Sequence, residues 1–404
     1  MVRRSLLTIV AVLLVVAGCV VVSTPAGAVV DSATIASSPN PSPSFNELRS
    51  VSCVSASSCL AVGTEFNAPV NSPLVLAWDG EFWVQVASPD FGNGGGSLDA
   101  ASCVSPSSCT AVGSYSENGS PSETLVMVWD GVSWNRLSSP NIGTGSNVLS
   151  SVSCVSVSSC TAVGNHDDAG TWKTLVLVWD GISWTHATSP NYGVGSNYLV
   201  SVSCVSATWC VAVGDYLDSG SKTLVLVGDG ATWTQGTSPN PSAASNALNS
   251  VSCVSTSICT AVGYTYTGIL TETVALIWDG ITWTRVASPN SSDTENVLNS
   301  VSCATTTSCS AVGVYIDNDF VFRTMVLAWD GSTWSPVPSP SPGTVEDQLE
   351  SVSCGSEFLC LAVGYTVSGS VTETLVLSLT GREPAPTTTT TSASSDPVAP
   401  AFAG

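Results

Sequence analysis

The sequence predicts an all-β protein in which seven repeated units of four strands form a seven-bladed β-propeller. Three observations predict this fold. Cysteine pairs with the spacing C-x5-C recur seven times, with 49 to 51 residues between successive first cysteines. Each repeat holds four short segments rich in β-branched and aromatic residues, bounded by turn residues and without a helical period. The last repeat lacks its fourth segment, and a matching segment stands near the amino terminus. Four strands in a repeat of about 50 residues are typical of a propeller.

The fifth repeat illustrates the four expected strands. They are "LNSVSCV" (248–254), "CTAVGYT" (259–265), "TVALIW" (273–278) and "ITWTRVASP" (281–289). Turn residues bound each of these segments. The dipeptide Asp279-Gly280, between the third and fourth strands, is a signal for a two-residue hairpin turn. The same dipeptide recurs in five other repeats, at Asp79, Asp130, Asp180, Asp229 and Asp330.

The two ends of the chain favour a closed ring over an open solenoid of β units. The segment "TIASSPN" (Thr34 to Asn40) aligns with "TRVASPN" (Thr284 to Asn290). In both places the first cysteine of the next repeat follows 13 residues after the asparagine. We therefore expect the amino-terminal segment to supply the outermost strand of the seventh blade. A closed ring also removes exposed sheet edges.

Composition divides the chain into three parts. Residues 1–28 have the charged start, apolar run and small residues before Ala28 that are typical of a secretory signal peptide. Residues 29–381 hold the repeats, and residues 382–404 form a Thr/Ser/Pro-rich tail with the composition of a disordered segment. The segment "VAGC", ending at Cys19, resembles the lipobox of bacterial lipoproteins. The chain is thus expected to be secreted after cleavage at Ala28, and the alternative is a lipid anchor on Cys19. No apolar run is long enough for a stable transmembrane span.

The strand pattern resembles the kelch family of propellers. In that family the second strand ends in Gly-Gly, the third ends in Tyr-Asp, and a tryptophan opens the fourth. Here the second strands end in one glycine within "TAVG", the third end in Trp-Asp, and a tryptophan such as Trp184 or Trp283 opens the fourth. The resemblance covers residues 30 to 381. It implies a propeller fold and no particular activity, because propellers host many functions.

The cysteine pairs are expected to be disulfides. One cysteine ends the first strand and the other begins the second, so a hairpin places them opposite each other in an exported, oxidised protein. Zinc sites favour two to four residues between paired cysteines, and redox motifs have the spacing C-x-x-C. The expected pairs are Cys53–Cys59, Cys103–Cys109, Cys154–Cys160, Cys204–Cys210, Cys253–Cys259, Cys303–Cys309 and Cys354–Cys360.

The net charge of the chain limits the classes of partner that it is expected to bind. Nine Lys and Arg residues stand against 30 Asp and Glu residues, for a net charge of -21. Nucleic-acid binding requires a basic surface, and the sequence contains no basic stripe. We expect an extracellular glycan or protein as the partner of a monomer.

The loops that differ between repeats are the expected binding surface. In a four-strand blade, the second-to-third loops and the connections between repeats emerge on the same face, and loops on a rigid scaffold commonly carry function. The candidate ligand-binding residues lie in three of these loops: His166, Asp167, Asp168, Trp172, Asp215, Asp218, Asp317 and Asp319. Asp167, Asp168, Asp317 and Asp319 are candidate Ca²⁺ ligands, although no loop has the spacing of an EF-hand. The alternative is that these loops are polar because they are exposed to solvent. Apart from the possible Ca²⁺, no cofactor is expected.

The function predicted is that of a binding or interaction module. The chain contains only two histidines and lacks G-x-S-x-G, H-E-x-x-H and phosphate-binding loop motifs, which disfavours an enzyme. The regularly recurring tryptophans and Asp-Gly dipeptides are interpreted as packing and turn residues. Two alternatives remain. One is a carbohydrate-active hydrolase or lyase with paired carboxylates across the central face, and the other is a structural component of the cell surface.

Overall fold

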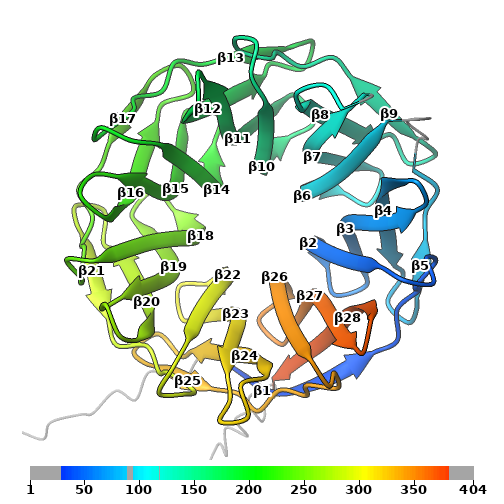
Figure 1. The fold of residues 1–404 in the computed structure, drawn as a ribbon, viewed down its shortest axis with the longest axis vertical. Helices are drawn as coiled ribbons and strands as arrows, with labels where there is room; N and C mark the ends of the chain where they lie inside the picture. Colours follow the sequence, from blue (N-terminus) through cyan, green and yellow to red (C-terminus); the bar gives the residue numbers. More distant parts are fainter. Residues whose placement is uncertain (1–28, 89–93, 118, 382–404) are drawn as a thin grey trace, which may run out of the picture.

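A computed structural model describes residues 29–88, 94–117 and 119–381 of the chain. Within these ranges the chain forms 28 β-strands and no helix, which confirms the all-β prediction. Accordingly, none of these residues belongs to a helix long and apolar enough to cross a membrane. Figure 1 shows the strands as successive small sheets around a central opening. The predicted signal peptide and tail lie outside the described residues.

Six units each contain four strands that pair in chain order. Unit one contains β2 (Asn46–Ser55), β3 (Ser58–Asn67), β4 (Val70–Trp78) and β5 (Trp83–Gln85). Unit two contains β6 (Gly95–Ser105), β7 (Ser108–Ser116), β8 (Glu123–Trp129) and β9 (Trp134–Leu137). Unit three contains β10 (Asn147–Ser156), β11 (Ser159–Asp168), β12 (Thr171–Trp179) and β13 (Trp184–His186). Unit four contains β14 (Asn197–Ser206), β15 (Trp209–Leu217), β16 (Ser221–Gly228) and β17 (Trp233–Gln235). Unit five contains β18 (Ser245–Ser255), β19 (Ile258–Tyr266), β20 (Thr271–Trp278) and β21 (Trp283–Val286). Unit six contains β22 (Asn296–Thr305), β23 (Ser308–Ile316), β24 (Phe322–Trp329) and β25 (Trp334–Pro336).

Unit seven is assembled from both ends of the described chain. It contains β26 (Glu346–Ser356), β27 (Leu359–Ser368) and β28 (Val371–Gly381), and β1 (Val30–Ala36) pairs antiparallel with β28. Val30 lies opposite Gly381 in this ladder. The predicted role of the amino-terminal strand is therefore confirmed. A single residue pair between β24 and β26 also joins units six and seven into one eight-stranded sheet.

The segment after β1 repeats a contact found inside the other units. The backbone N–H of Thr374 donates to Asn40 Oδ1 at 2.7 Å, and the hydroxyls of Thr374 and Ser38 lie 2.7 Å apart. In unit five, the N–H of Thr273 donates to Asn290 Oδ1 at 2.9 Å in the same way. The "SPN" segments therefore fix the outer edge of the sheets of units two to five and of unit seven, which joins the two ends, and Ser341 takes the place of the asparagine in unit six.

The hydrophobic core lies between neighbouring units. Val112 of unit two packs with Leu149 and Leu175 of unit three, whereas Val163 of unit three faces the core shared with unit four. Alternate residues of a strand point to opposite faces, and here both faces are covered. This accounts for the unbroken apolar runs, such as "TLVLVW", in the third strand of a unit.

The recurring glycine of "TAVG" is required by close backbone contact. The pairing register between β10 and β11 shifts between Leu149 and Ser151. A Cβ added to Gly164 would lie 2.0 Å from the carbonyl oxygen of Val148. Only glycine fits such an approach of two backbones.

The two serines of the repeated "SVSC" segment form hydrogen bonds between units, which we call the serine belt. Ser151 and Ser153 of unit three accept hydrogen bonds from the backbone N–H groups of Val202 and Cys204 of unit four, at 3.2 and 3.0 Å. Equivalent bonds join each unit to the next. One position differs, because Ala100 of unit two replaces the serine.

The serine belt also joins the last unit to the first. Ser351 and Ser353 accept hydrogen bonds from the N–H groups of Val51 and Cys53, at 3.2 and 2.9 Å. The innermost strands contact one another in the order β2, β6, β10, β14, β18, β22 and β26, and β26 contacts β2. Figure 1 shows the same succession around the central opening.

Every predicted cysteine pair lies at disulfide distance. The seven S–S distances run from 2.02 to 2.09 Å. In each unit the two cysteines are direct partners across the first and second strands, as Cys154 and Cys160 are. Each bond closes a short loop, so its entropic contribution to stability is about 2 kcal/mol.

Candidate functional site

The turns of the units lie on two different faces. In the short third-to-fourth strand turns, the aspartate caps the backbone, as Asp180 Oδ1 does by accepting from the N–H groups of Ile182 and Ser183 at 2.8 Å each. The second-to-third turns meet the connections between units on the other face. There the N–H of Asp167 donates to the carbonyl of Ser146 at 2.8 Å, and such bonds recur between other units. We call this surface the variable-loop face and the opposite surface the short-turn face.

The loop between the second and third strands of unit three is shorter than the sequence predicts. His166, Asp167 and Asp168 belong to β11, and Trp172 belongs to β12, so only Ala169 and Gly170 form the turn. Polar residues at the solvent end of a hairpin have the composition of a loop, although their backbones are paired. All four candidate residues of this hairpin therefore stand on strands.

His166 is half-buried in this hairpin. Burial lowers the pKa of His166, and the nearby charge of His186 lowers it further. Its Nδ1 is buried and contacts no hydrogen-bond partner among the described residues. Asp167 Oδ1 caps the turn by accepting from the N–H of Gly170 at 2.7 Å, and the N–H of Trp172 donates to Ser196 Oγ at 3.2 Å. These contacts give Asp167 a structural part in the hairpin.

Asp215 and Asp218 lie in the equivalent hairpin of unit four. Asp215 belongs to β15, and Asp218 lies in the exposed turn that follows. Burial raises the pKa of Asp215, and Ser221 Oγ donates to its carboxylate at 2.5 Å. The carboxylate of Asp215 is thus bound to a side chain of its own hairpin.

Asp317 is paired inside the turn of unit six. Its carboxylate accepts from Arg323 Nε at 2.8 Å and from the N–H groups of Asp319 and Val321 at 2.9 and 3.0 Å. The hydrogen bond from Arg323 and the bonds from the backbone lower the pKa of Asp317. These donors occupy the oxygen atoms that were the candidate Ca²⁺ ligands.

The structure distributes the eight predicted residues over three hairpins instead of bringing them together. In the described ranges, no group of three or more His, Cys, Asp or Glu side chains is arranged to hold a metal ion. The Ca²⁺ hypothesis therefore gains no support from the positions of Asp167, Asp168, Asp317 and Asp319.

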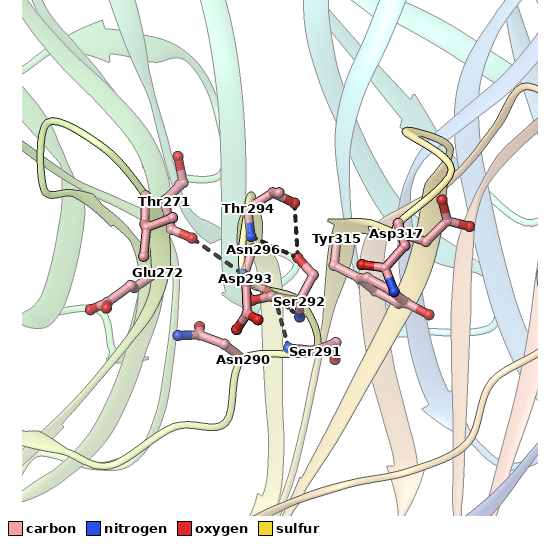
Figure 2. A pocket seen from close by; sticks show the side chains of 12 residues that line it. Thr271, Glu272, Asn290, Ser291, Ser292, Asp293, Thr294, Asn296, Tyr315 and Asp317 are labelled. Carbon is pink, nitrogen blue, oxygen red and sulfur yellow. Dashed lines mark hydrogen bonds between the residues drawn. The ribbon is translucent and has the colours of Figure 1, made fainter.

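A polar hollow of about 500 Å³ opens on the variable-loop face between units five and six. We call it the junction hollow. Its lining comes from Leu270 and the start of β20, from the connection of residues 290–294, and from the end of β23 with the turn that follows. Figure 2 shows this connection between Glu272 of unit five and Tyr315 and Asp317 of unit six. Asp293 and Asn318 add a carboxylate and an amide.

One buried asparagine holds the connection in shape. Asn296 is 1% exposed, and its Oδ1 accepts from the N–H groups of Ser291 and Ser292 at 2.8 and 3.0 Å. Its Nδ2 donates to the carbonyls of Ser292 and Thr271 at 2.9 and 3.3 Å. These bonds, drawn in Figure 2, tie the connection to unit five. The junction hollow is thus pre-formed.

A second hollow, of about 480 Å³, lies among the innermost strands. It is lined by the residue that follows the buried leucine of each innermost strand. These residues are Arg49, Asp99, Ser150, Val200, Asn249, Asn299 and Glu350. We call it the central channel. The same backbone position thus carries cationic, anionic, amide, hydroxyl and apolar side chains.

Charged side chains gather on one side of the central channel. Arg49 Nη1 lies 2.5 Å from Asp99 Oδ1, and Arg49 Nε lies 3.3 Å from Glu47 Oε1. Burial opposes the charge of Arg49, but the two carboxylates outweigh it and raise the pKa of Arg49. On the neighbouring strand β26, Gln348 Nε2 donates to Glu350 Oε1 at 2.6 Å.

Glu350 has a strongly perturbed carboxyl group in the central channel. Burial raises the pKa of Glu350 to about 7, and the charge of Glu47 raises it as well, while Arg49 and Gln348 act in the opposite direction. A carboxyl group of this kind exchanges a proton near neutral pH. The sequence interpretation missed this residue. The signal available was the change of residue type at one position of an otherwise repeated strand.

Comparison with known proteins shows the fold. No model of a known protein family and no curated protein matches the chain. The structure of YCF48 bound to D1 peptide matches with a TM-score of 0.54 and 13% identity, over 87% of this chain and 99% of that one. The WD40 β-propeller domain of Doa1 matches with a TM-score of 0.50 and 11% identity, over 87% of this chain and 97% of that domain. This chain therefore has a β-propeller fold, and identities this low carry no information about its activity.

Proposed function

We propose that this chain is a closed, seven-bladed propeller that is exported and binds an extracellular protein or glycan through its variable-loop face. The observation that carries the proposal is the difference between the two faces. The short-turn face repeats the same capped turns, whereas the variable-loop face holds the junction hollow and differs from unit to unit. Loops that vary on a rigid scaffold are suited to recognition.

Two further features support the proposal. The YCF48 structure contains a bound peptide, so a propeller of similar shape serves as a binding module. Seven cysteine pairs at disulfide distance suit an oxidising compartment, in agreement with a signal peptide over residues 1–28 and secretion. We further propose that the protein is a monomer related to the kelch family, with a disordered tail over residues 382–404. The alternative to secretion is a lipid anchor on Cys19.

The test compares the two faces of the protein. Arrays of extracellular proteins and glycans are probed with the intact protein, with and without Ca²⁺. A first variant replaces Asp168, Asp218 and Asn318 of the variable-loop face by alanine. A matched variant replaces three exposed residues of the short-turn face, Val132, Ile182 and Ile281, by serine. We expect binding to fall in the first variant and to persist in the second, and the reverse result would overturn the proposal.

A hydrolase that acts in the central channel is the second candidate. The observation that favours it is the buried Glu350 carboxyl group, whose pKa burial raises to about 7, in a channel that Glu47 also lines. A carboxyl group that holds a proton near neutral pH is suited to general acid catalysis. Its test is a screen of oligosaccharide substrates with the wild type, Glu350→Gln and Glu47→Gln. Turnover that both substitutions abolish would support the hydrolase, and turnover by neither the wild type nor the variants would exclude it for those substrates.

A further inference from the structure

The junction hollow is open at a place that two other junctions fill, although the junction between units one and two also holds a smaller hollow, of about 360 Å³. Between units three and four, the rings of Tyr192 and Tyr216 pack with their centroids 6.2 Å apart. Tyr315 occupies the position of Tyr216 in its own unit, but Ser291 stands where Tyr192 would stand. Between units six and seven, Arg323 crosses the junction and donates to the carbonyl of Gly343 at 3.1 Å. The short side chain of Ser291 therefore leaves space beside Tyr315.

The lining of the junction hollow offers hydrogen-bonding groups that the protein itself does not use. Within the part of the chain that the structure describes, the Asp293 carboxylate and the Asn318 amide form no hydrogen bond or ion pair. Glu272 has one distant ion pair, with Arg285 at 3.8 Å. Since Asn296 fixes the backbone of the connection, the position from which Asp293 reaches into the hollow is set before any ligand arrives.

The chemistry of this lining selects among ligands. Glu272, Asp293 and Asp317 line the hollow together with hydroxyl and amide groups, and its lining contains no Lys, Arg or His. Asp317 and Glu272 are paired with Arg323 and Arg285, which lie outside the lining. An anionic ligand would therefore meet the unpaired carboxylate of Asp293 and no free cation in the lining. A peptide side chain is commonly anchored by a buried apolar pocket, and Leu270 is the only aliphatic residue in this lining.

A sugar ring satisfies each of these conditions. Its hydroxyl groups donate strong hydrogen bonds to carboxylates, and its apolar face packs on an aromatic ring such as Tyr315. The volume of about 500 Å³ lies within the usual range for a small-ligand site. We propose that the junction hollow binds a neutral saccharide. This inference rests on the proposed function, since it assigns a ligand class to one part of the variable-loop face.

The test uses saturation-transfer NMR on the full, disulfide-bonded protein. The probes are the methyl glycosides of glucose, galactose, mannose and N-acetylglucosamine, with methyl glucuronoside as the anionic comparison. We expect transfer to at least one neutral probe and weaker transfer to the glucuronoside. Asp293→Ala should weaken binding about tenfold, because it removes a charged acceptor.

Two variants make the result specific to this place. Ser291→Tyr should abolish binding by filling the hollow as Tyr192 fills the junction of units three and four, although it removes no charged group. Glu117→Ala is the matched control, because it removes an exposed carboxylate from the turn of unit two. It should bind as the wild type does, and thermal melting checks that each variant is folded.

Three results would overturn the inference. They are transfer to none of the neutral probes, equal binding by the wild type and Ser291→Tyr, and glucuronoside binding as tight as that of the neutral probes. If these occur while the variable-loop variants still lose their array ligand, the saccharide assignment fails and the proposed function stands. If saccharide binding is found but the array ligand binds the short-turn face, the proposed function fails instead.

Discussion

The backbone N–H of Cys53 donates a hydrogen bond to the hydroxyl of Ser353 at 2.9 Å, across 300 residues of sequence. The same bond links Cys204 to Ser153 inside the chain, at 3.0 Å. The contact between the last unit and the first is therefore equivalent to the contacts between consecutive units. Stability should depend on each link of this serine belt to a similar degree.

The serine belt has one gap that a substitution can fill. Ala100 stands where the serine of other units accepts from the next innermost strand, so Ala100→Ser would supply an acceptor for the N–H of Val152. We expect the free energy of unfolding to rise by about 0.5–1 kcal/mol, as urea titration would measure. Ala101→Ser is the control, because the other units carry valine at this position and a hydroxyl beside Leu98 supplies no acceptor to the belt, so it should lower stability. A loss of stability in Ala100→Ser would contradict the role of the belt.

The first strand should be needed for the seventh unit. Deletion of residues 29–40 removes the β1–β28 ladder and the contacts of Ser38 and Asn40 with Thr374. Because an open edge and a lost outer strand are both unfavourable, we expect the melting temperature to fall by several degrees. Differential scanning calorimetry would measure it. An unchanged melting curve would show that closure by this strand contributes nothing.

A missing tryptophan constrains unit four. Gly228 stands where units one and three carry Trp78 and Trp179, and a Cβ on Gly228 would lie 2.6 Å from Trp233 Cε2. Gly228→Ala should therefore cost about 1–3 kcal/mol, because the ring of Trp233 must move. At Gly236 the nearest atom would lie 3.4 Å away, so Gly236→Ala is the matched control with a smaller cost. Chemical denaturation measures both, and equal costs would count against this packing.

Glu350 should make stability depend on pH. Its pKa is about 7 in the folded protein and is raised above the ordinary value of 4.5, so the folded state holds the proton more tightly. The resulting stability is complete below pH 4.5 and is lost as the pH rises through 7. We expect Glu350→Gln to raise the unfolding free energy at pH 8 by about 1–3 kcal/mol and to have little effect at pH 4.

Urea titrations at both pH values would measure this difference. Glu117→Gln, at an exposed position, is the control and should show no comparable difference between pH 4 and pH 8. A Glu350→Gln variant with the same pH profile as the wild type would show that Glu350 titrates normally.

Local and repeated features were predictable from the sequence. The strands, the cysteine pairs and the pairing of β1 with β28 follow from patterns that recur in every unit. The serines of "SVSC" recur as well, yet their partners are backbone groups of another unit, which a strand pattern does not identify. The hairpin of Asp167 and Trp172 resembled a loop because polar side chains cover paired backbone at its solvent end.

The candidate sites were less predictable because they depend on contacts between units. Arg49 and Asp99 are 50 residues apart, and only the arrangement of the innermost strands brings their side chains together. The junction hollow likewise exists because the short side chain of Ser291 leaves space at the junction of units five and six. A repeat shows which positions vary, but the structure is needed to show which varying positions face one another.

The pairing of Val30 with Gly381 has a consequence for engineering. The two ends of the propeller lie side by side, so a short linker would join them into a continuous circle of chain. Because the links between units are equivalent, the circle can then be cut at a connection between other units. Such circular permutants should fold to the same propeller and would allow a fused domain to be displayed beside any chosen unit.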